Sequence, residues 1–311
     1  MGKVGKFFGV VVIALTVLGT GGVASAATSL PLGQGDFAGS VGLGGGRTMY
    51  LECYGQGSPT VVLDSGLRNG AGIWAQREPD TPPGPTVLPA LAHFTRVCAY
   101  DRPGVIASFE PLESSRSSPV PMPRTAAGAA ADLDAMLRAA RVPGPYVLVS
   151  HSTGGLIDRL FAAEHPRQVA GLVLVDALAE GLQTRLDRTQ LDAYEALNNG
   201  PIEGIEYDLE RYRFRKSFEQ VRRATRAHPL GDIPVSVISH GLPFSLPESL
   251  PGGLSSKVIE DAWTHAQDLL AGLTPDAVHV VAKRSSHYIM LTQPRLVIAQ
   301  VERVVREARR G

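Results

Sequence analysis

The feature that most constrains this chain is a series of short, continuously apolar segments that alternate with stretches of helical periodicity. A strand that is apolar at every position needs cover on both faces, as in a parallel sheet between layers of helices. The fold class is therefore predicted to be α/β, with a mostly parallel sheet. The candidate strands are residues 48–54, 60–63, 96–100, 146–149, 171–175, 235–239 and 278–282.

Helices are expected between these strands, where apolar residues recur at helical spacing. The clearest are residues 125–141, 154–165 and 294–309. A short Gly-Gln-Gly-Ser-Pro turn joins the apolar runs at 50–54 and 61–63. Turns of this kind connect adjacent strands, so the sheet is expected to begin with an antiparallel hairpin between these two runs.

One connection is much longer than the others. It joins the strands at 171–175 and 235–239, and at about 60 residues it far exceeds the usual αβ loop. We expect residues 27–311 to form one domain with a cap insertion at about 178–232. Within the insertion, four residues at near-helical spacing are expected to pack against the main body rather than line a substrate site. They are Leu209, Tyr212, Phe218 and Val221.

The N-terminus has the pattern of a secretory signal peptide. Two lysines precede an apolar run at residues 7–18, and small residues follow up to Ala26. This run is shorter than the roughly 20 residues of a membrane-spanning helix, so an uncleaved anchor is the weaker alternative. We expect residues 1–26 to be removed and the protein to be secreted without a stable membrane anchor. Export would allow Cys53 and Cys98 to form a lasting disulfide, and two buried thiols are the alternative.

The charge pattern excludes some partners. The 30 basic residues balance the 30 acidic ones, and no segment is a block of like charge. Nucleic-acid binders carry a clustered basic surface, so we expect no nucleic acid partner and favour small molecules. The chain has no H-E-x-x-H or C-x-x-C motif and no glycine-rich dinucleotide fingerprint. No metal site and no cofactor are therefore predicted.

The strongest chemical signal follows the run at residues 146–149. A strand, a tight turn and an amphipathic helix come in the order required of the G-x-S-x-G nucleophile elbow, whose turn exposes a serine hydroxyl. Ser152 is the candidate nucleophile, and the backbone N–H of Thr153 can stabilise an oxyanion at the start of the helix. The other elbow positions are Ser150, which replaces the usual glycine with another small residue, and His151, Gly154 and Gly155.

Three motifs together resemble the α/β-hydrolase fold superfamily, in particular its secreted bacterial esterase-like members. They are TVVLDSG at 60–66, RVCAYDRPG at 96–104 and SHSTGG at 150–155. The resemblance extends from about Gly44 to the C-terminus. It implies an eight-stranded, mostly parallel sheet flanked by helices, and a chain order of nucleophile, acid and histidine.

The resemblance also indicates the base, the histidine that removes the serine proton. His287 follows the last candidate strand and precedes the closing helix, where the family order places this residue. His151 is adjacent to the nucleophile and is expected to point away from Ser152 and pack. The second oxyanion donor is expected to be the N–H of Leu67, which follows the TVVLDSG motif and would act with the N–H of Thr153.

The acid is less clearly marked. Many superfamily members carry it after the strand that ends here near His240, but residues 241–244 contain no carboxylate. Asp176, at the end of the strand at 171–175, occupies an alternative acid position of the superfamily and is the choice. Its other possible role is to cap the following segment. The alternatives for the acid are Glu248, Glu260 and Asp261.

The family's strand order has two further implications. The second strand neighbours the fourth, so Cys53 and Cys98 would lie on adjacent strands and could form a disulfide. The expected activity is that of a secreted serine hydrolase, a carboxylic ester hydrolase with a small-molecule ester-like substrate. Amidase, lactonase or acyltransferase activity could use the same residues. A ligand-binding protein without turnover is the remaining alternative, because the usual acid position at residues 241–244 contains no carboxylate.

Overall fold

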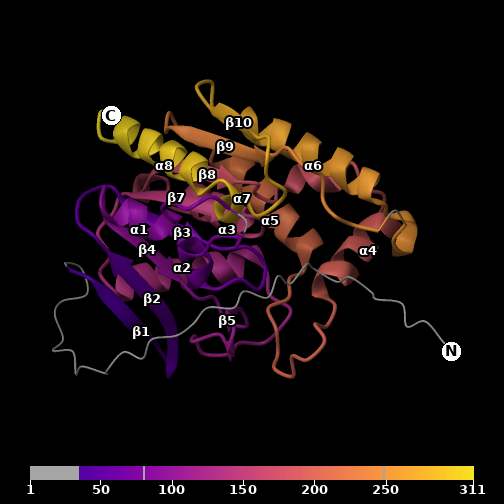
Figure 1. Cartoon of the computed structure of the whole chain (residues 1–311), viewed down its shortest axis with the longest axis horizontal. Helices are drawn as coiled ribbons and strands as arrows, with labels where there is room; N and C mark the ends of the chain where they lie inside the picture. Colours follow the sequence, from indigo (N-terminus) through magenta and orange to yellow (C-terminus); the bar gives the residue numbers. More distant parts are fainter. Residues whose placement is uncertain (1–34, 80, 248) are drawn as a thin grey trace.

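The computed structural model describes residues 35–79, 81–247 and 249–311 (Figure 1). The expected signal peptide at residues 1–26 and one alternative acid, Glu248, lie outside the described residues. Within the described ranges, none of the helices combines the length and the apolar character needed to cross a membrane.

In the described part of the chain, eight strands form the central sheet in the order β1-β2-β4-β3-β7-β8-β9-β10. β1 and β4 pair antiparallel with β2, and all other neighbouring strands of this sheet are parallel. The prediction of an α/β fold with an eight-stranded, mostly parallel sheet is confirmed. The strands of the sheet are β1 (Phe37–Gly44), β2 (Arg47–Tyr54), β3 (Thr60–Asp64), β4 (Val97–Tyr100), β7 (Tyr146–His151), β8 (Val169–Val175), β9 (Val235–His240) and β10 (Val278–Ala282). β5 (Ile106–Phe109) and β6 (Leu112–Ser114) form a separate hairpin.

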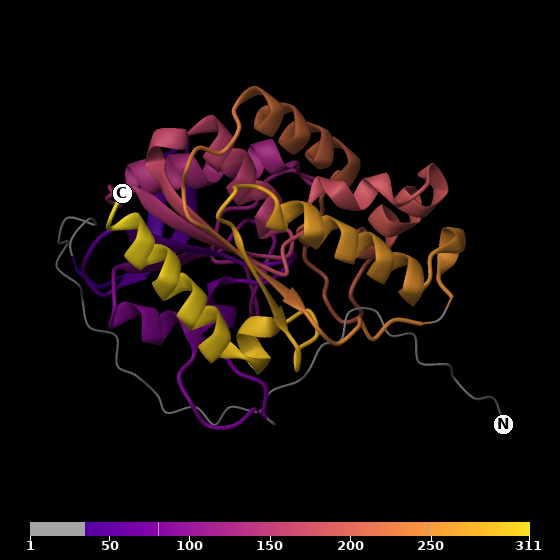
Figure 2. The ribbon, with the colours of Figure 1, turned by 90° about the horizontal axis from the view of Figure 1, so that it is seen from above.

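Both faces of the sheet are buried, which explains the continuously apolar strands. In β3, Val62 belongs to one core cluster, and Val61 and Leu63 belong to the other. Helices α2, α3, α5 and α6 pack in the first cluster, and α1, α7 and α8 in the second. Figure 2 shows α8, in yellow, on one side of the strands and the pink helices on the other. The helices are α1 (Val87–Ala92), α2 (Ala126–Ala139), α3 (Gly154–Glu164), α4 (Arg188–Asn199), α5 (Phe214–Ala227), α6 (Ser256–Ala271), α7 (Ile289–Thr292) and α8 (Pro294–Ala308).

The expected hairpin between residues 50–54 and 61–63 is wrong. β2 pairs with β1 and β4, and β4 lies between β2 and β3. Neighbouring strands are about 4.8 Å apart, so the turn at 55–59 crosses a gap of about 10 Å, which five residues span easily. The hairpin at this edge is β1–β2. The sequence does not indicate β1, because in this Gly-rich segment exposed positions alternate with buried or partly buried ones and no apolar run forms.

The long connection between β8 and β9 contains α4, α5 and the 3₁₀ helix η3 (Glu180–Thr184). Its four regularly spaced residues, Leu209, Tyr212, Phe218 and Val221, are all buried, in agreement with packing against the main body. They do not share one helix, because α5 begins only at Phe214.

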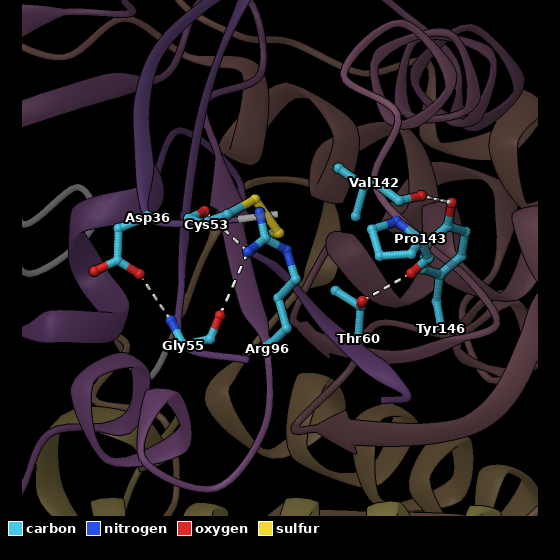
Figure 3. Close-up of a disulfide and its surroundings, with 10 residues drawn as sticks. Asp36, Cys53, Gly55, Thr60, Arg96, Val142, Pro143 and Tyr146 are labelled. Atoms are coloured by element: carbon cyan, nitrogen blue, oxygen red, sulfur yellow. Dashed lines mark hydrogen bonds between the residues drawn. A yellow bond between two sulfur atoms is a disulfide. The ribbon is translucent and has the colours of Figure 1, made fainter. Parts of the chain in front are cut away.

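A disulfide joins Cys53 of β2 to Cys98 of β4 (Figure 3). The two residues are directly opposite each other in the antiparallel register, and both are fully buried. The bond therefore ties the antiparallel edge of the sheet to its parallel part. It closes a chain segment with a sequence separation of 45.

Removal of this disulfide is expected to destabilise the protein. Because the bond restricts the unfolded chain, replacing both cysteines by alanine should lower the free energy of unfolding by about 2–4 kcal/mol. Alanine avoids leaving a hydroxyl in an apolar site. Urea unfolding of the wild type and the double variant measures the difference, and an unchanged midpoint would contradict the expectation.

Candidate active site

The turn between β7 and α3 holds Ser152 in an unusual backbone conformation. Its φ is 52°, in the left-handed region that residues with side chains rarely adopt. Hydrogen bonds fix the turn, because the carbonyl oxygen of Ser152 accepts from the N–H groups of Gly155 at 2.9 Å and Leu178 at 2.7 Å. Leu178 lies just beyond β8, so the loop after the neighbouring strand supports the strained turn. A strained turn of this kind is the backbone feature of a nucleophile elbow.

Two glycines allow other parts of the backbone to pass close to this turn. A Cβ atom at position 154 would lie 2.9 Å from the carbonyl oxygen of Asp64, and one at position 155 would lie 2.6 Å from Cβ of Ala177. Larger residues than Gly154 and Gly155 would therefore displace β3 or the loop after β8. Ser150 is fully buried in β7 and lies opposite Asp64 in the parallel register.

His287 lies in the loop between β10 and α7 and contacts the carboxylate of Asp176. Its Nδ1 is 2.6 Å from Oδ2 of Asp176. The rings of Phe244 and Trp263 pack around it, each with its centroid 5.2 Å from that of His287. The side chain of His287 remains 18% exposed. When Nδ1 donates to Asp176, Nε2 is left as a basic nitrogen that can accept a proton.

His151 connects Ser152 to His287. Its ring centroid lies 4.5 Å from that of His287, and its Nε2 lies 2.9 Å from the carbonyl oxygen of the same residue. Because a carbonyl oxygen accepts, Nε2 of His151 donates. Burial, together with the proximity of His287, lowers the pKa of His151 well below its usual value. A neutral His151, directly before Ser152 in the chain, thus supports the loop that carries His287. The hydroxyl of Ser152 has no hydrogen-bond partner among the described residues.

Asp176 is fully buried at the carboxyl end of β8. Besides His287, its carboxylate receives Nε1 of Trp263 at 3.1 Å and Nδ1 of His240 at 2.8 Å. Burial by itself would raise the pKa of Asp176, but the hydrogen bonds from His240 and His287 hold that pKa far below its usual range. The buried carboxylate is therefore ionised.

The two alternative acids within the described ranges contact other groups. Glu260 accepts hydrogen bonds from the ring of His240 and from the backbone N–H of Phe244. Asp261 pairs with Lys257 at 2.5 Å and is 63% exposed. Among the described carboxylates, Asp176 is thus the one in hydrogen-bond contact with the ring of His287. The contact between His240 and Asp176 was not anticipated from the sequence.

The loop after β3 lies against the turn that holds Ser152. A Cβ at position 66 would lie 2.7 Å from Nδ1 of His151 and 3.1 Å from Cβ of Ser152, so this close approach requires Gly66. The N–H groups of Leu67 and Thr153 have no hydrogen-bond acceptor in the described part of the chain. Two free N–H groups near a serine can stabilise an oxyanion.

Arg102 fixes the orientation of this loop. Its guanidinium donates to the carbonyl oxygens of Ser65 at 2.8 Å and Gly66 at 2.7 Å. In a trans peptide the N–H points opposite to the preceding carbonyl, so the N–H of Leu67 is directed away from Arg102. Arg102 also pairs with Asp64 and, through Nε at 2.7 Å, with Glu210.

Glu210 comes from the long connection between β8 and β9 and is fully buried. Its Oε2 accepts from Nη2 of Arg102 at 3.0 Å and from the backbone N–H of Arg68 at 2.9 Å. The insertion thereby holds both the guanidinium and the loop after β3. Glu210 could not be identified from the sequence, because a single carboxylate in a long irregular segment carries no local signal.

Replacing Glu210 by glutamine is expected to be strongly destabilising. Removal of one charge leaves the buried guanidinium of Arg102 incompletely paired, which should cost about 3–5 kcal/mol in the free energy of unfolding. Glu203 lies in the same segment and is exposed. The matched variant Glu203→Gln should therefore change stability by less than about 0.5 kcal/mol. Urea unfolding of both variants checks the difference, and equal stabilities would contradict it.

Comparison with family models identifies one family. Residues 61–301 match the model of the Alpha/beta hydrolase family. A segment of 92 residues is 42% identical to the uncharacterized protein C23C11.06c of Schizosaccharomyces pombe, but it covers 29% of this chain and only 15% of that protein. The uncharacterized protein YqjL of Bacillus subtilis is 25% identical over 244 residues, which cover 78% of this chain and 82% of YqjL.

Solved structures show the same fold. Est816, described as an N-acyl homoserine lactone degrading enzyme, is 19% identical and superposes with a TM-score of 0.55, covering 86% of this chain and all of that one. A thermophilic esterase from Thermogutta terrifontis is 18% identical with a TM-score of 0.54, covering 88% of this chain and 99% of the esterase. At these identities the similarity establishes the fold and leaves the substrate to be argued from the site.

Proposed function

The chain belongs to the alpha/beta hydrolase family, and on that premise we propose that it is a serine hydrolase that cleaves carboxylic esters of small molecules. The observation that carries the proposal is the 2.6 Å contact between His287 and Asp176, and the strained Ser152 follows directly after His151, whose ring contacts His287. The N–H groups of Leu67 and Thr153, which have no acceptor among the described residues, complete the groups that acyl transfer requires.

The proposed reaction has two halves. In the first, Oγ of Ser152 bonds to the acyl carbon, its proton passes to Nε2 of His287, and the carbonyl oxygen becomes an oxyanion held by the two N–H groups. The oxyanion then collapses, the bond to the alcohol oxygen breaks, and Nε2 gives its proton to the leaving alcohol. In the second half, a water oxygen bonds to the acyl carbon and its proton passes to Nε2 of His287. The bond from the acyl carbon to Oγ of Ser152 then breaks, Nε2 returns the proton to Oγ, and the acid leaves. Asp176 keeps Nδ1 of His287 protonated throughout.

Two rival functions differ in how well the site fits them. Lactone hydrolysis uses the same chemistry, and one structural neighbour, Est816, is described as a lactone-degrading enzyme. A non-catalytic binding protein is the other rival, because residues 241–244 contain no carboxylate. The contact between Asp176 and His287 argues against that alternative, because it supplies a carboxylate to the histidine from the neighbouring strand.

The proposed site of action is outside the cell. The signal-like pattern of residues 1–26 supports export, and the buried Cys53–Cys98 disulfide fits an oxidising compartment. Expression of the full chain in a bacterial host, followed by mass determination of the exported protein, tests this proposal. A protein that begins at Ala27 is expected, and a full-length protein retained in the cytoplasm would contradict it.

A fluorophosphonate probe tests the proposed function. Such probes phosphonylate activated serines, so the expected result is a stoichiometric adduct that peptide mapping places on Ser152. In parallel, p-nitrophenyl esters of different acyl lengths are compared with matched amides and lactones, and esters are expected to give the highest kcat/KM. Absence of an adduct together with absence of turnover would favour the binding protein.

A further inference from the structure

A second imidazole, that of His240, contacts the carboxylate of Asp176. His240 ends β9, and its side chain is 7% exposed. Its Nδ1 lies 2.9 Å from Oδ1 and 2.8 Å from Oδ2 of Asp176, and its backbone N–H donates to Oδ1 at 3.2 Å. On the other side of the ring, Nε2 lies 3.1 Å from Oε2 of Glu260. His240 thus bridges two carboxylates from two different elements, β8 and α6.

This arrangement determines the charge of His240. Ionised carboxylates only accept hydrogen bonds, so both ring nitrogens have to donate, and a histidine that donates from both is an imidazolium. Burial by itself lowers the pKa of His240, but the hydrogen bonds to Asp176 and Glu260 raise it to about 10. The titratable groups facing His240 are these two carboxylates and, across Asp176, the ring of His287.

The same contacts restrict rotation of the Asp176 carboxylate. Oδ1 is held by Nε1 of Trp263 at 3.1 Å and by the backbone and ring of His240. Oδ2 faces Nδ1 of His287 at 2.6 Å and also lies 2.8 Å from the ring Nδ1 of His240, so both rings contact this oxygen. Glu260 is in turn anchored by the backbone N–H of Phe244. The donors on Oδ1 therefore come from α6 and β9, elements that carry neither Ser152 nor His287.

We infer that His240 is a positioning residue of this site: an imidazolium clamped between Asp176 and Glu260 that keeps Asp176 ionised and its Oδ2 directed at His287. The inference rests on the proposed serine hydrolase function and assigns a role to the residue at the end of β9. It also explains how the chain functions without a carboxylate at residues 241–244, because the acid reaches His287 from β8 and is fixed from β9.

His240→Leu is the primary test. The variant loses the charge and the ring hydrogen bonds, so kcat per probe-reactive site is expected to fall about 10–100-fold, the equivalent of one charged hydrogen bond. Loss of the cation removes a charge that opposes protonation of His287 and removes donors that keep Asp176 ionised. Both changes move the acid limb of the pH profile of kcat/KM to higher pH, by about one unit.

A conservative variant separates positioning from a structural role. In His240→Asn, the side-chain amide can still donate to Asp176 but carries no charge. The kcat of His240→Asn is therefore expected to be close to that of the wild type, whereas the acid limb of its pH profile of kcat/KM stays at the higher pH seen in His240→Leu. His279 on β10 is an exposed histidine whose ring contacts Ser239, and His279→Leu is the control that should leave both quantities unchanged. Fluorophosphonate titration of active sites corrects for any unfolded fraction.

The outcomes distinguish this inference from the proposed function. If the wild type is an active esterase and His240→Leu keeps its kcat per reactive site and its acid limb, the inference is overturned and the function stands. If the wild type is neither active nor labelled, the function fails, and NMR of ¹⁵N-labelled histidines tests the clamp directly. In the expected spectrum, both ring nitrogens of His240 are protonated at pH 8. The signal of the proton on Nδ1 of His287 is expected to lose intensity in His240→Leu. A neutral His240, or a His287 signal that does not respond, overturns the inference.

Discussion

Replacing Ser152 by alanine is expected to lower kcat for ester hydrolysis by about a millionfold. Without the hydroxyl no acyl-enzyme forms, and only direct attack by water remains, assisted by the two free N–H groups and by substrate binding. The fold should persist, because alanine keeps the Cβ atom and the hydrogen bonds that hold the turn are made by the backbone. Steady-state hydrolysis of a p-nitrophenyl ester, with far-UV circular dichroism as the check on folding, measures the effect.

Ser236→Ala is the matched control for this variant. Ser236 is fully buried in β9 and donates to Gln300 at 2.8 Å, away from the His287–Asp176 pair. We expect the control to lose about 1 kcal/mol of stability and to keep its turnover rate. If Ser152→Ala retained more than about one hundredth of the wild-type kcat, another group would have to be the nucleophile.

The parts of the fold that could be predicted from sequence are the strands that are buried on both faces of the sheet. Strands such as β3 and β8 are covered on both faces, so their central positions form an apolar run and the strand is visible in the sequence. The edge strand β1 has a solvent face and several glycines, which leaves no continuous run. The position of β4 between β2 and β3 could not be inferred from the short turn at 55–59, because a five-residue connection fits both neighbouring and next-neighbouring strands.

The residues of the candidate site likewise fall into those that a local sequence pattern predicts and those that it does not. Ser152 lies in a local pattern of strand, turn and helix, and His287 and Asp176 each follow a strand, so their positions in the sequence carried information. Glu210 and Glu260 carry no such pattern. Their roles depend on contacts with Arg102 and His240, more than 100 residues away for Glu210 and 20 for Glu260. Contacts of this kind are set by the packing of α6 and the long insertion, and not by any spacing within the chain.

Asp176→Asn is expected to reduce kcat by about 10⁴-fold. The amide is nearly the same size, but its NH₂ group competes for the position facing Nδ1 of His287. The histidine then favours the tautomer with the proton on Nε2, which cannot accept the proton of Ser152. The Asp261→Asn variant, at an exposed position paired with Lys257, should keep wild-type activity. If instead Asp176→Asn stayed active and Glu260→Gln lost 10⁴-fold, the acid would have to be Glu260.

Stability of the same variant tests the ionisation of Asp176 independently of any substrate. The folded-state pKa of Asp176 lies far below its usual value, so its contribution to stability is present above the unfolded pKa of about 3.9 and is lost as the pH falls through the lower folded value. In Asp176→Asn this contribution is absent at every pH, and the imidazolium of His240 faces a neutral amide. The variant should therefore be less stable than the wild type at neutral pH, and its stability should fall less steeply below about pH 4. Urea unfolding at a series of pH values gives the free energy of unfolding of each protein as a function of pH. If the two plots ran parallel through and below pH 4, Asp176 would not be held ionised by the two histidines.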